Sequence, residues 1–267
     1  MNFIKKCLNF YHYIRYIKLS NLNYRKTNDD KKNNIIDKLD KKKFLVIKNF
    51  MTKKKCNTII KKIDKTVLNK KIKTWSDSSN SDQRIFGAEN LSYEIESFFK
   101  NNFINKIGSS YTKIKLNTYM TMANKTVFKQ KNKGSGGGWH KDSFKKQFKA
   151  ILYLNDVNSK NGPFELIPNS CSTIFNYKLI FKFKRNLINS RFSNNEIKKI
   201  LKKNNSTSIK ITGKAGTLIL VDTSLIHRGN PLKCGIRYAL TNYMYPKHKF
   251  DLYEDKFKPI LKKKLFN

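Results

Sequence analysis

The sequence predicts a mainly β domain with flanking helices, folded as a barrel or a sandwich. Short runs of β-branched and aromatic residues, separated by turns that contain Gly, Pro and Asn, occupy much of residues 114–245. Ahead of them, apolar residues repeat with a helical period over residues 56–67. The chain has 267 residues, 39% of them hydrophobic, which is enough to bury the core of one large domain.

Residues 1–35 are predicted to form a basic N-terminal extension, and residues 36–267 to form one domain. Residues 1–20 lack acidic side chains and mix aromatic residues with Lys and Arg, which predicts an amphipathic helix. This helix either packs on the domain or lies on an anionic membrane surface, and we favour packing. Its apolar runs are too short for a transmembrane segment or a secretory signal. Residues 21–34 are polar and predict a linker.

The domain is predicted to begin with a strand and two helices. The run "FLVIKNF" at residues 44–50 predicts the strand, and Thr52 after it predicts the N-cap of a helix. Two apolar stripes with a period of 3.6 residues predict the helices. The stripes consist of Cys56, Ile59, Ile60, Ile63 and Val67, and of Leu91, Ile95, Phe98 and Phe99.

The remainder is predicted to be strands with one long insertion. Residues 174–208 form the insertion, and the capping-box pattern "SNNE" opens a helix within it at Ser193. The predicted strands lie within residues 114–128, 148–154, 164–168, 208–212, 216–222 and 236–245.

A formal net charge of +39 raises nucleic acid and anionic membranes as partners. The excess is mostly Lys, spread from end to end and accompanied by many Asn and Ile, a composition typical of AT-rich genomes. We therefore interpret it as a solvated surface, with nonspecific, salt-dependent polyanion binding as a consequence. The four cysteines have no metal-finger or disulfide spacing, which favours free thiols in a reducing compartment, and we expect a cytoplasmic protein.

The motif "HKD" points to a metal. Side chains at i and i+2 of a strand share a face, so His140 and Asp142 are predicted to reach one ion. His227 ends the apolar strand "GTLILVDTSLIH" and is predicted to supply a third ligand. Two histidines and one carboxylate form the facial triad of non-haem Fe(II) oxygenases, which leaves coordination positions open.

Arg237 follows His227 by ten residues, on the strand that returns after a turn. Its planar guanidinium suits a carboxylate held through two hydrogen bonds, as the distal carboxylate of 2-oxoglutarate requires. Each of these four residues is weak evidence alone, but together they favour a metal-dependent oxygenase.

Four of the eleven glycines lie within residues 134–138, directly before the motif. Glycine permits positive φ and close backbone approach, so we interpret the segment as a flexible lip over the metal that admits substrate. A purely structural loop is the alternative. Trp139 is expected to face away from the two ligands that follow it.

The segments "GWHKDS", "AILYLNDVNSKNGPFELIPNS" and "GTLILVDTSLIHRGNPLKCGIRYALTNY" resemble the phytanoyl-CoA dioxygenase family, and the resemblance covers about Phe44 to Pro246. It implies a double-stranded β-helix, the jelly-roll or cupin-like core, with helices outside. It also implies Fe(II), 2-oxoglutarate and O2 as cofactor and co-substrates.

The resemblance assigns roles to six residues. His140, Asp142 and His227 correspond to the iron ligands, and Arg237 to the residue that pairs with the 2-oxoglutarate side-chain carboxylate. Tyr153 is similar in placement to a tyrosine of the related prolyl hydroxylases that also meets this carboxylate, with an aromatic packed in a strand as the alternative. The last of the six is Asn124, expected to reach the co-substrate from the neighbouring strand.

The function we expect is hydroxylation of a C–H bond in a small organic substrate, lipid-like or metabolite-like, with release of succinate and CO2. One alternative is a catalytically inactive jelly-roll module that binds nucleic acid or anionic surfaces. Another is an oxygenase that acts on a macromolecule. Substrate choice is assigned to residues 174–208 and 134–138, and the sequence indicates no oligomeric state.

Overall fold

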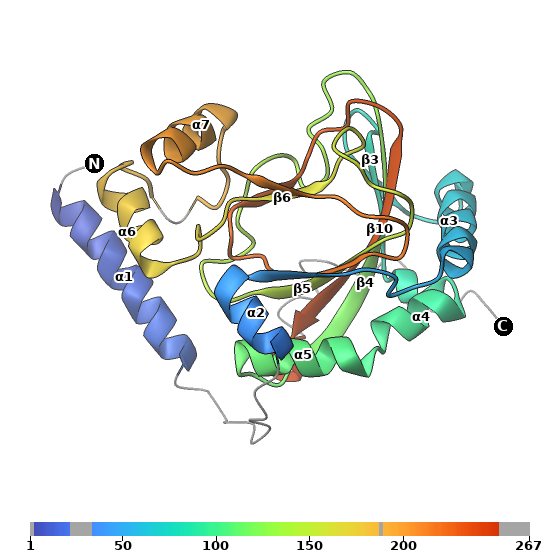
Figure 1. Ribbon diagram of the computed structural model, residues 1–267, viewed down its shortest axis with the longest axis horizontal. Helices are drawn as coiled ribbons and strands as arrows, with labels where there is room; N and C mark the ends of the chain where they lie inside the picture. The colour runs from blue at the N-terminus through green and yellow to red at the C-terminus, as the bar shows by residue number, and fades with distance from the viewer. Residues whose placement is uncertain (1–2, 22–33, 187–188, 251–267) are drawn as a thin grey trace.

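The computed structural model describes residues 3–21, 34–186 and 189–250. Its strands form two antiparallel sheets, one of seven strands in the order β1-β8-β5-β10-β4-β3-β2 and one of three in the order β7-β6-β9. Helices flank the sheets (Figure 1), so the predicted mainly β fold with a jelly-roll core is confirmed. The strands are β1 (Phe44–Ile47), β2 (Trp75–Ser76), β3 (Asp82–Phe86), β4 (Asn117–Val127), β5 (Phe148–Tyr153), β6 (Phe164–Leu166), β7 (Ile209–Ile211), β8 (Leu218–Asp222), β9 (His227–Gly229) and β10 (Ile236–Tyr245).

Alternation along the strands divides the core into two layers. On β5 and β10, Leu152 and Leu240 belong to the cluster that packs against the helices. Their neighbours Ile151 and Ala239 belong to the cluster between the two sheets. Because successive strand residues point to opposite faces, one face of the large sheet binds the helices and the other lies toward the small sheet.

The helices are α1 (Phe3–Asn21), α2 (Asn34–Lys42), α3 (Lys53–Leu68), α4 (Tyr93–Phe99), α5 (Asn102–Thr112), α6 (Thr173–Phe181) and α7 (Asn194–Lys203), with the short 3-10 turns η1 (Ala88–Asn90) and η2 (Lys247–Lys249). The predicted N-cap is present, since the Thr52 side chain accepts a hydrogen bond from the Lys55 amide. The predicted capping box is present as well, between Ser193 and Glu196 at the start of α7. Helices α2 and α5 were not predicted, and both pack on the outer face of the large sheet.

Helix α1 packs on α6 at one end of the molecule, at the left of Figure 1. Asn176 of α6 donates a hydrogen bond to the hydroxyl of Tyr13, with 2.7 Å between Nδ2 and Oη. Phe10 meets Tyr177 edge to face, with 5.4 Å between ring centroids. Helix α1 thus packs on the domain, which is the arrangement that we favoured from the sequence. Residues 22–33 of the predicted linker lie outside the described residues.

None of the helices within the described ranges is long and apolar enough to cross a membrane.

Candidate metal centre

The backbone holds the two motif histidines directly opposite each other. His140 and His227 form an antiparallel bridge in which each amide donates to the other carbonyl, with 2.9 Å between N and O in both bonds. The Asp142 amide donates to the carbonyl of Thr223 at 3.0 Å. These bonds bring residues distant in the chain to one point.

The prediction that "HKD" lies in a strand is wrong. His140 makes only isolated bridges, to His227 and Arg191, and Asp142 belongs to no strand. The positive-φ glycines before the motif prevent a regular ladder on that side. The shared direction of the two side chains comes from bonds to β9 and to Thr223 instead.

The imidazole rings are oriented by carbonyl groups. Nδ1 of His140 lies 2.8 Å from the Gly138 carbonyl oxygen, and Nδ1 of His227 lies 2.9 Å from that of Leu225. A carbonyl only accepts, so each Nδ1 carries the proton and each Nε2 presents a lone pair. This is the orientation in which an imidazole binds a metal through Nε2.

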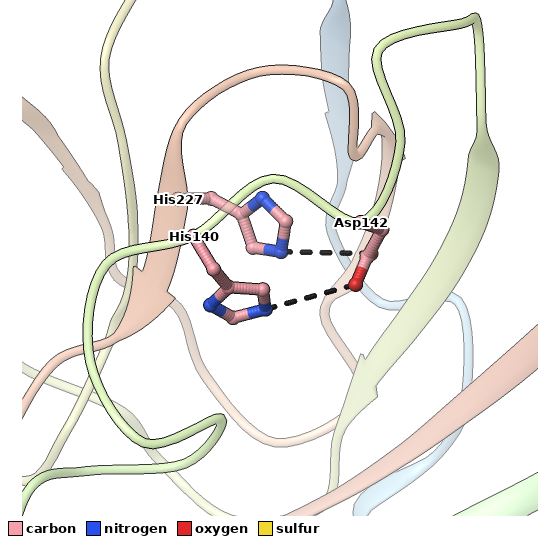
Figure 2. A group of neighbouring side chains, drawn as sticks. All are labelled: His140, Asp142 and His227. Carbon is pink, nitrogen blue, oxygen red and sulfur yellow. Dashed lines mark ion pairs between the residues drawn. The ribbon is translucent and has the colours of Figure 1, made fainter. Parts of the chain in front are cut away.

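The three side chains converge (Figure 2). Nε2 of His140 lies 3.6 Å from Oδ1 of Asp142, and Nε2 of His227 lies 3.6 Å from Oδ2. One ligand atom from each residue falls within 4.8 Å of the others. Ligand atoms bonded at about 2.1 Å and at right angles around one ion are about 3 Å apart, so a small inward movement fits a metal here.

The charge state also suits a cation. Burial lowers the pKa of His227 to about 3, helped by the neighbouring His140, and burial likewise lowers the pKa of His140. Both rings are therefore neutral near pH 7. Burial pushes the pKa of Asp142 upward, but Lys149 and the two histidines outweigh it and hold the pKa well below its usual range. The site offers two neutral nitrogens and one carboxylate.

The glycine segment packs directly on the site. A Cβ on Gly136, whose φ is +88°, would lie 2.7 Å from Cε1 of His140. A Cβ on Gly134, with φ +70°, would lie 2.1 Å from the carbonyl oxygen of Gly229. Arg191 from the insertion donates to the Gly136 carbonyl at 2.8 Å. Positive φ and close approach are thus confirmed, and whether the segment moves stays a prediction.

Trp139 is buried in a separate cluster with Tyr13 and Ile226, as its predicted outward direction requires. The guanidinium carbon of Arg228 lies 4.2 Å from its ring centroid. The tryptophan therefore anchors the motif to the α1 and α6 end of the molecule.

All six residues singled out from the sequence line one cavity of about 740 Å³. The floor comes from alternate residues of two paired strands, with Tyr153 opposite Ala239, Ile151 opposite Thr241 and Lys149 opposite Tyr243. Arg237, two residues before Ala239 on β10, extends this row at the Tyr153 end. The floor therefore runs from a guanidinium to an ammonium.

Arg237 is 4% exposed and held from several sides. Nη1 donates to the Gly162 carbonyl, and Nη2 donates to Oδ1 of Asn124 at 3.0 Å and to Oγ1 of Thr126 at 3.4 Å. Its Nε–H has no partner among the described residues. A buried guanidinium that lines a cavity and has an unused donor is suited to a carboxylate.

Tyr153 and Asn124 lie beside Arg237 but are already engaged. The Tyr153 hydroxyl donates to the Ile211 carbonyl at 2.9 Å and accepts from the Phe164 amide at 2.7 Å. Asn124 accepts from Arg237 and donates to Asp82. In this arrangement Asn124 supports the guanidinium, and the single proton of Tyr153 is used within the protein.

Sequence reasoning missed Lys149. Its Nζ lies 2.8 Å from Oδ2 of Asp142 and 4.0 Å from the ring centroid of Tyr243. Burial lowers the pKa of Lys149, but Asp142 and Tyr243 outweigh it, so the pKa is raised and the group is charged. Its position two residues before Ile151 and four before Tyr153 was the available signal, but one more lysine does not stand out in a chain with 57 Lys and Arg.

The chain matches a known protein family. The sequence profile of the phytanoyl-CoA dioxygenase (PhyH) family matches residues 40–235. No curated protein sequence matches.

Solved structures with a similar fold include three that contain a bound metal ion. SnoN, an epimerase from nogalamycin biosynthesis in complex with Fe3+, alpha ketoglutarate and nogalamycin RO, is 11% identical with a TM-score of 0.58, over 79% of this chain and 82% of that one. HygX from Streptomyces hygroscopicus, with nickel, 2-oxoglutarate and hygromycin B, is 13% identical with a TM-score of 0.56, over 79% and 86%. EctD from S. alaskensis with bound Fe is 15% identical with a TM-score of 0.61, over 84% and 80%. At these identities the likeness shows a shared fold.

Proposed function

The chain belongs to the phytanoyl-CoA dioxygenase family, whose enzymes depend on Fe(II) and 2-oxoglutarate and use O2, and from this premise we propose that it hydroxylates a C–H bond of a small organic substrate. The observation that carries the proposal is the convergence of His140, Asp142 and His227 in the same cavity as a buried Arg237 with an unused donor. The structurally similar proteins include an epimerase and a carbocyclase, so hydroxylation as the reaction type is our proposal.

The three converging side chains are the proposed iron ligands. The neutral Nε2 atoms of His140 and His227 and one oxygen of Asp142 would hold the ion. When bound, iron and 2-oxoglutarate together reduce O2, release succinate and CO2, and deliver one oxygen atom to the substrate. The carbonyls of Gly138 and Leu225 fix the two rings, so little reorganisation is needed for binding.

Arg237 is the proposed anchor for the distal carboxylate of 2-oxoglutarate. Its other donors are taken by Gly162, Asn124 and Thr126, which fix the direction of the guanidinium. The unused Nε–H would donate to the carboxylate. Asn124 then contributes by positioning Arg237, and Tyr153 by closing the end of the cavity.

The cavity favours a small substrate. Its volume of about 740 Å³ is within the range of clefts that enclose metabolite-sized ligands. We place the reaction in a reducing compartment such as the cytoplasm, since all four cysteines are free thiols. An inactive module that binds anionic surfaces would need neither the buried guanidinium nor the oriented imidazoles.

Metal-dependent binding of 2-oxoglutarate tests the proposal. Calorimetric titration of the full chain should show one Co(II) or Fe(II) ion per chain under anaerobic conditions, and 2-oxoglutarate should bind only after the metal. Succinate should then form when O2 is admitted to the Fe(II) protein. Binding of 2-oxoglutarate that is equally tight without metal would refute the proposed arrangement.

A further inference from the structure

A lysine is buried at the metal end of the cavity. Lys149 has only 7% of its surface exposed, and its Nζ lies 2.8 Å from Oδ2 of Asp142. Its other neighbour on the floor, Tyr243, is a phenol. Buried lysines are rare and need a compensating anion. The only acidic residue among those that line the cavity is Asp142.

Lys149 and Arg237 stand at opposite ends of the floor. Lys149 and Tyr153 are four residues apart on β5, which separates their Cα atoms by about 13 Å. Arg237 lies beyond Tyr153 in this row, at the end of the cavity where we propose that 2-oxoglutarate binds. The ammonium of Lys149 is therefore at the Asp142 end of the floor, away from the proposed co-substrate anchor.

The charges of the loaded site do not balance without a further anion. On the proposed function, the two charges of Fe(II) are matched by the two carboxylates of 2-oxoglutarate, and Asp142 matches Arg237. The charge of Lys149 is then left over, because its carboxylate partner is shared with the ion. Arg191 at the cavity wall adds positive charge, and its guanidinium donates to the carbonyls of Gly136 and Gly137.

We propose that Lys149 binds an acidic group of the substrate, a carboxylate or a phosphate ester, so that the substrate is a small organic anion. The proposal rests on the function proposed above. An ammonium has three donors, so it can keep its bond to Asp142 while it donates to the substrate. The bond between Lys149 and the anion would fix the substrate beside the metal, with Tyr243 packed under the ammonium.

The test uses the full chain loaded with Co(II) and 2-oxoglutarate, at constant ionic strength. Acetate and methyl phosphate serve as probes for the two acidic groups, and acetamide serves as the neutral control for acetate. Calorimetry gives the affinity, and the visible spectrum of Co(II) reports whether a probe reaches the metal region. Lys149→Gln removes the charge but keeps a donor for Asp142, and Lys149→Met removes both. Lys210→Met, at an exposed position of β7 outside the cavity, controls for the loss of one positive charge.

We expect at least one anion to bind the loaded protein and acetamide not to bind. Its affinity should fall about 10-fold or more in both Lys149 variants and stay unchanged in Lys210→Met. Binding of acetate alone identifies a carboxylate, and binding of methyl phosphate alone identifies a phosphate ester.

Three results would overturn the proposal. The first is that neither anion binds the loaded wild-type protein, and the second is that the anion binds both Lys149 variants as tightly as wild type. The third is that both variants lose Co(II), which would make Lys149 a support for Asp142 only. Failure of the wild-type protein to bind Co(II) and 2-oxoglutarate would instead refute the underlying function.

Discussion

His140 and His227 are locked together by a pair of reciprocal backbone hydrogen bonds, and their ring centroids lie 4.4 Å apart. The pair joins the segment after the glycines to β9, so the two nitrogens meet without any covalent or metal link. A site formed this way should be assembled before the ion binds, and its dependence on each residue can be tested one at a time.

Loss of either histidine should abolish metal binding. His140→Ala and His227→Ala each remove one neutral nitrogen ligand from a set of three, so affinity for Co(II) should fall by at least about 100-fold. Calorimetry checks this. His248→Ala, at an exposed residue of η2, is the matched control and should bind as wild type does. Metal affinity in either ligand variant within a few-fold of wild type would remove that residue from the ligand set.

Gly136→Ala should weaken metal binding by displacing His140. The added methyl would lie 2.7 Å from Cε1 of His140 and the backbone has φ +88°. Gly235→Ala is the control, because its φ is +70° and the nearest heavy atom to the added Cβ is Cβ of Asn161, at 3.9 Å. Both variants should lose about 1 kcal/mol of stability from the backbone conformation. Only Gly136→Ala should also lose Co(II) affinity, by about 10-fold; equal metal affinities would show that the contact with His140 is unimportant.

Arg237→Lys should weaken 2-oxoglutarate binding while metal affinity stays unchanged. A lysine keeps the charge but loses the planar fork and the Nε–H, so the dissociation constant for 2-oxoglutarate should rise by about 10-fold or more. Arg191→Lys, at a cavity guanidinium that donates to the Gly136 carbonyl, is the comparison and should leave that constant unchanged. Titration of the Co(II) protein with 2-oxoglutarate measures both, and equal constants for Arg237→Lys and wild type would contradict the anchor role.

Glu89 should make the protein less stable as pH rises from about 4.5 to 7. Burial raises the pKa of its carboxyl to about 7, although the hydrogen bond that the carboxylate accepts from the Thr121 amide lowers the pKa. A group whose pKa is raised on folding binds more protons in the folded state. Its contribution to the free energy of unfolding is therefore fully present below the unfolded-state pKa, and it is lost as the pH rises through the folded-state pKa.

Urea unfolding at pH 5 and pH 8 measures this effect. The Glu89→Gln variant should lose the part of the pH dependence that Glu89 causes, at most about 1.4 kcal/mol per pH unit over that window. Glu94→Gln controls for the removed charge. An identical pH dependence in wild type and Glu89→Gln would show that Glu89 titrates normally.

The strands could be predicted because runs of β-branched and aromatic residues bounded by turn residues are a local signal. The side chains of Ile151 and Leu152 face different layers, but both are apolar and buried, so the sequence did not show which layer each one faces. Helix α5 was missed for a local reason as well. Its sequence includes Gly108, Ser109 and Ser110, which are weak helix formers, and Gly108 is there because a Cβ would lie 2.7 Å from Cδ1 of Phe148. Tertiary packing fixes that helix.

In the candidate site, too, some features could be predicted from the sequence and others depend on tertiary contacts. Spacing in the chain was enough to select His140, Asp142, His227 and Arg237, although the motif is not a strand. The partners of these residues come from other segments: Leu225 orients one ring, Gly162 holds the guanidinium, and Lys149 pairs with the carboxylate. Contacts of this kind depend on the register between distant strands, which single-residue patterns do not contain.

The most direct measurement is a crystal structure of the protein with Fe(II) and 2-oxoglutarate under anaerobic conditions, with the metal located by anomalous scattering. We expect one metal peak bonded to Nε2 of His140, Nε2 of His227 and an oxygen of Asp142, with the distal carboxylate of 2-oxoglutarate on Arg237. A peak bonded to other residues, or a carboxylate that leaves Arg237 without a partner, would contradict the account.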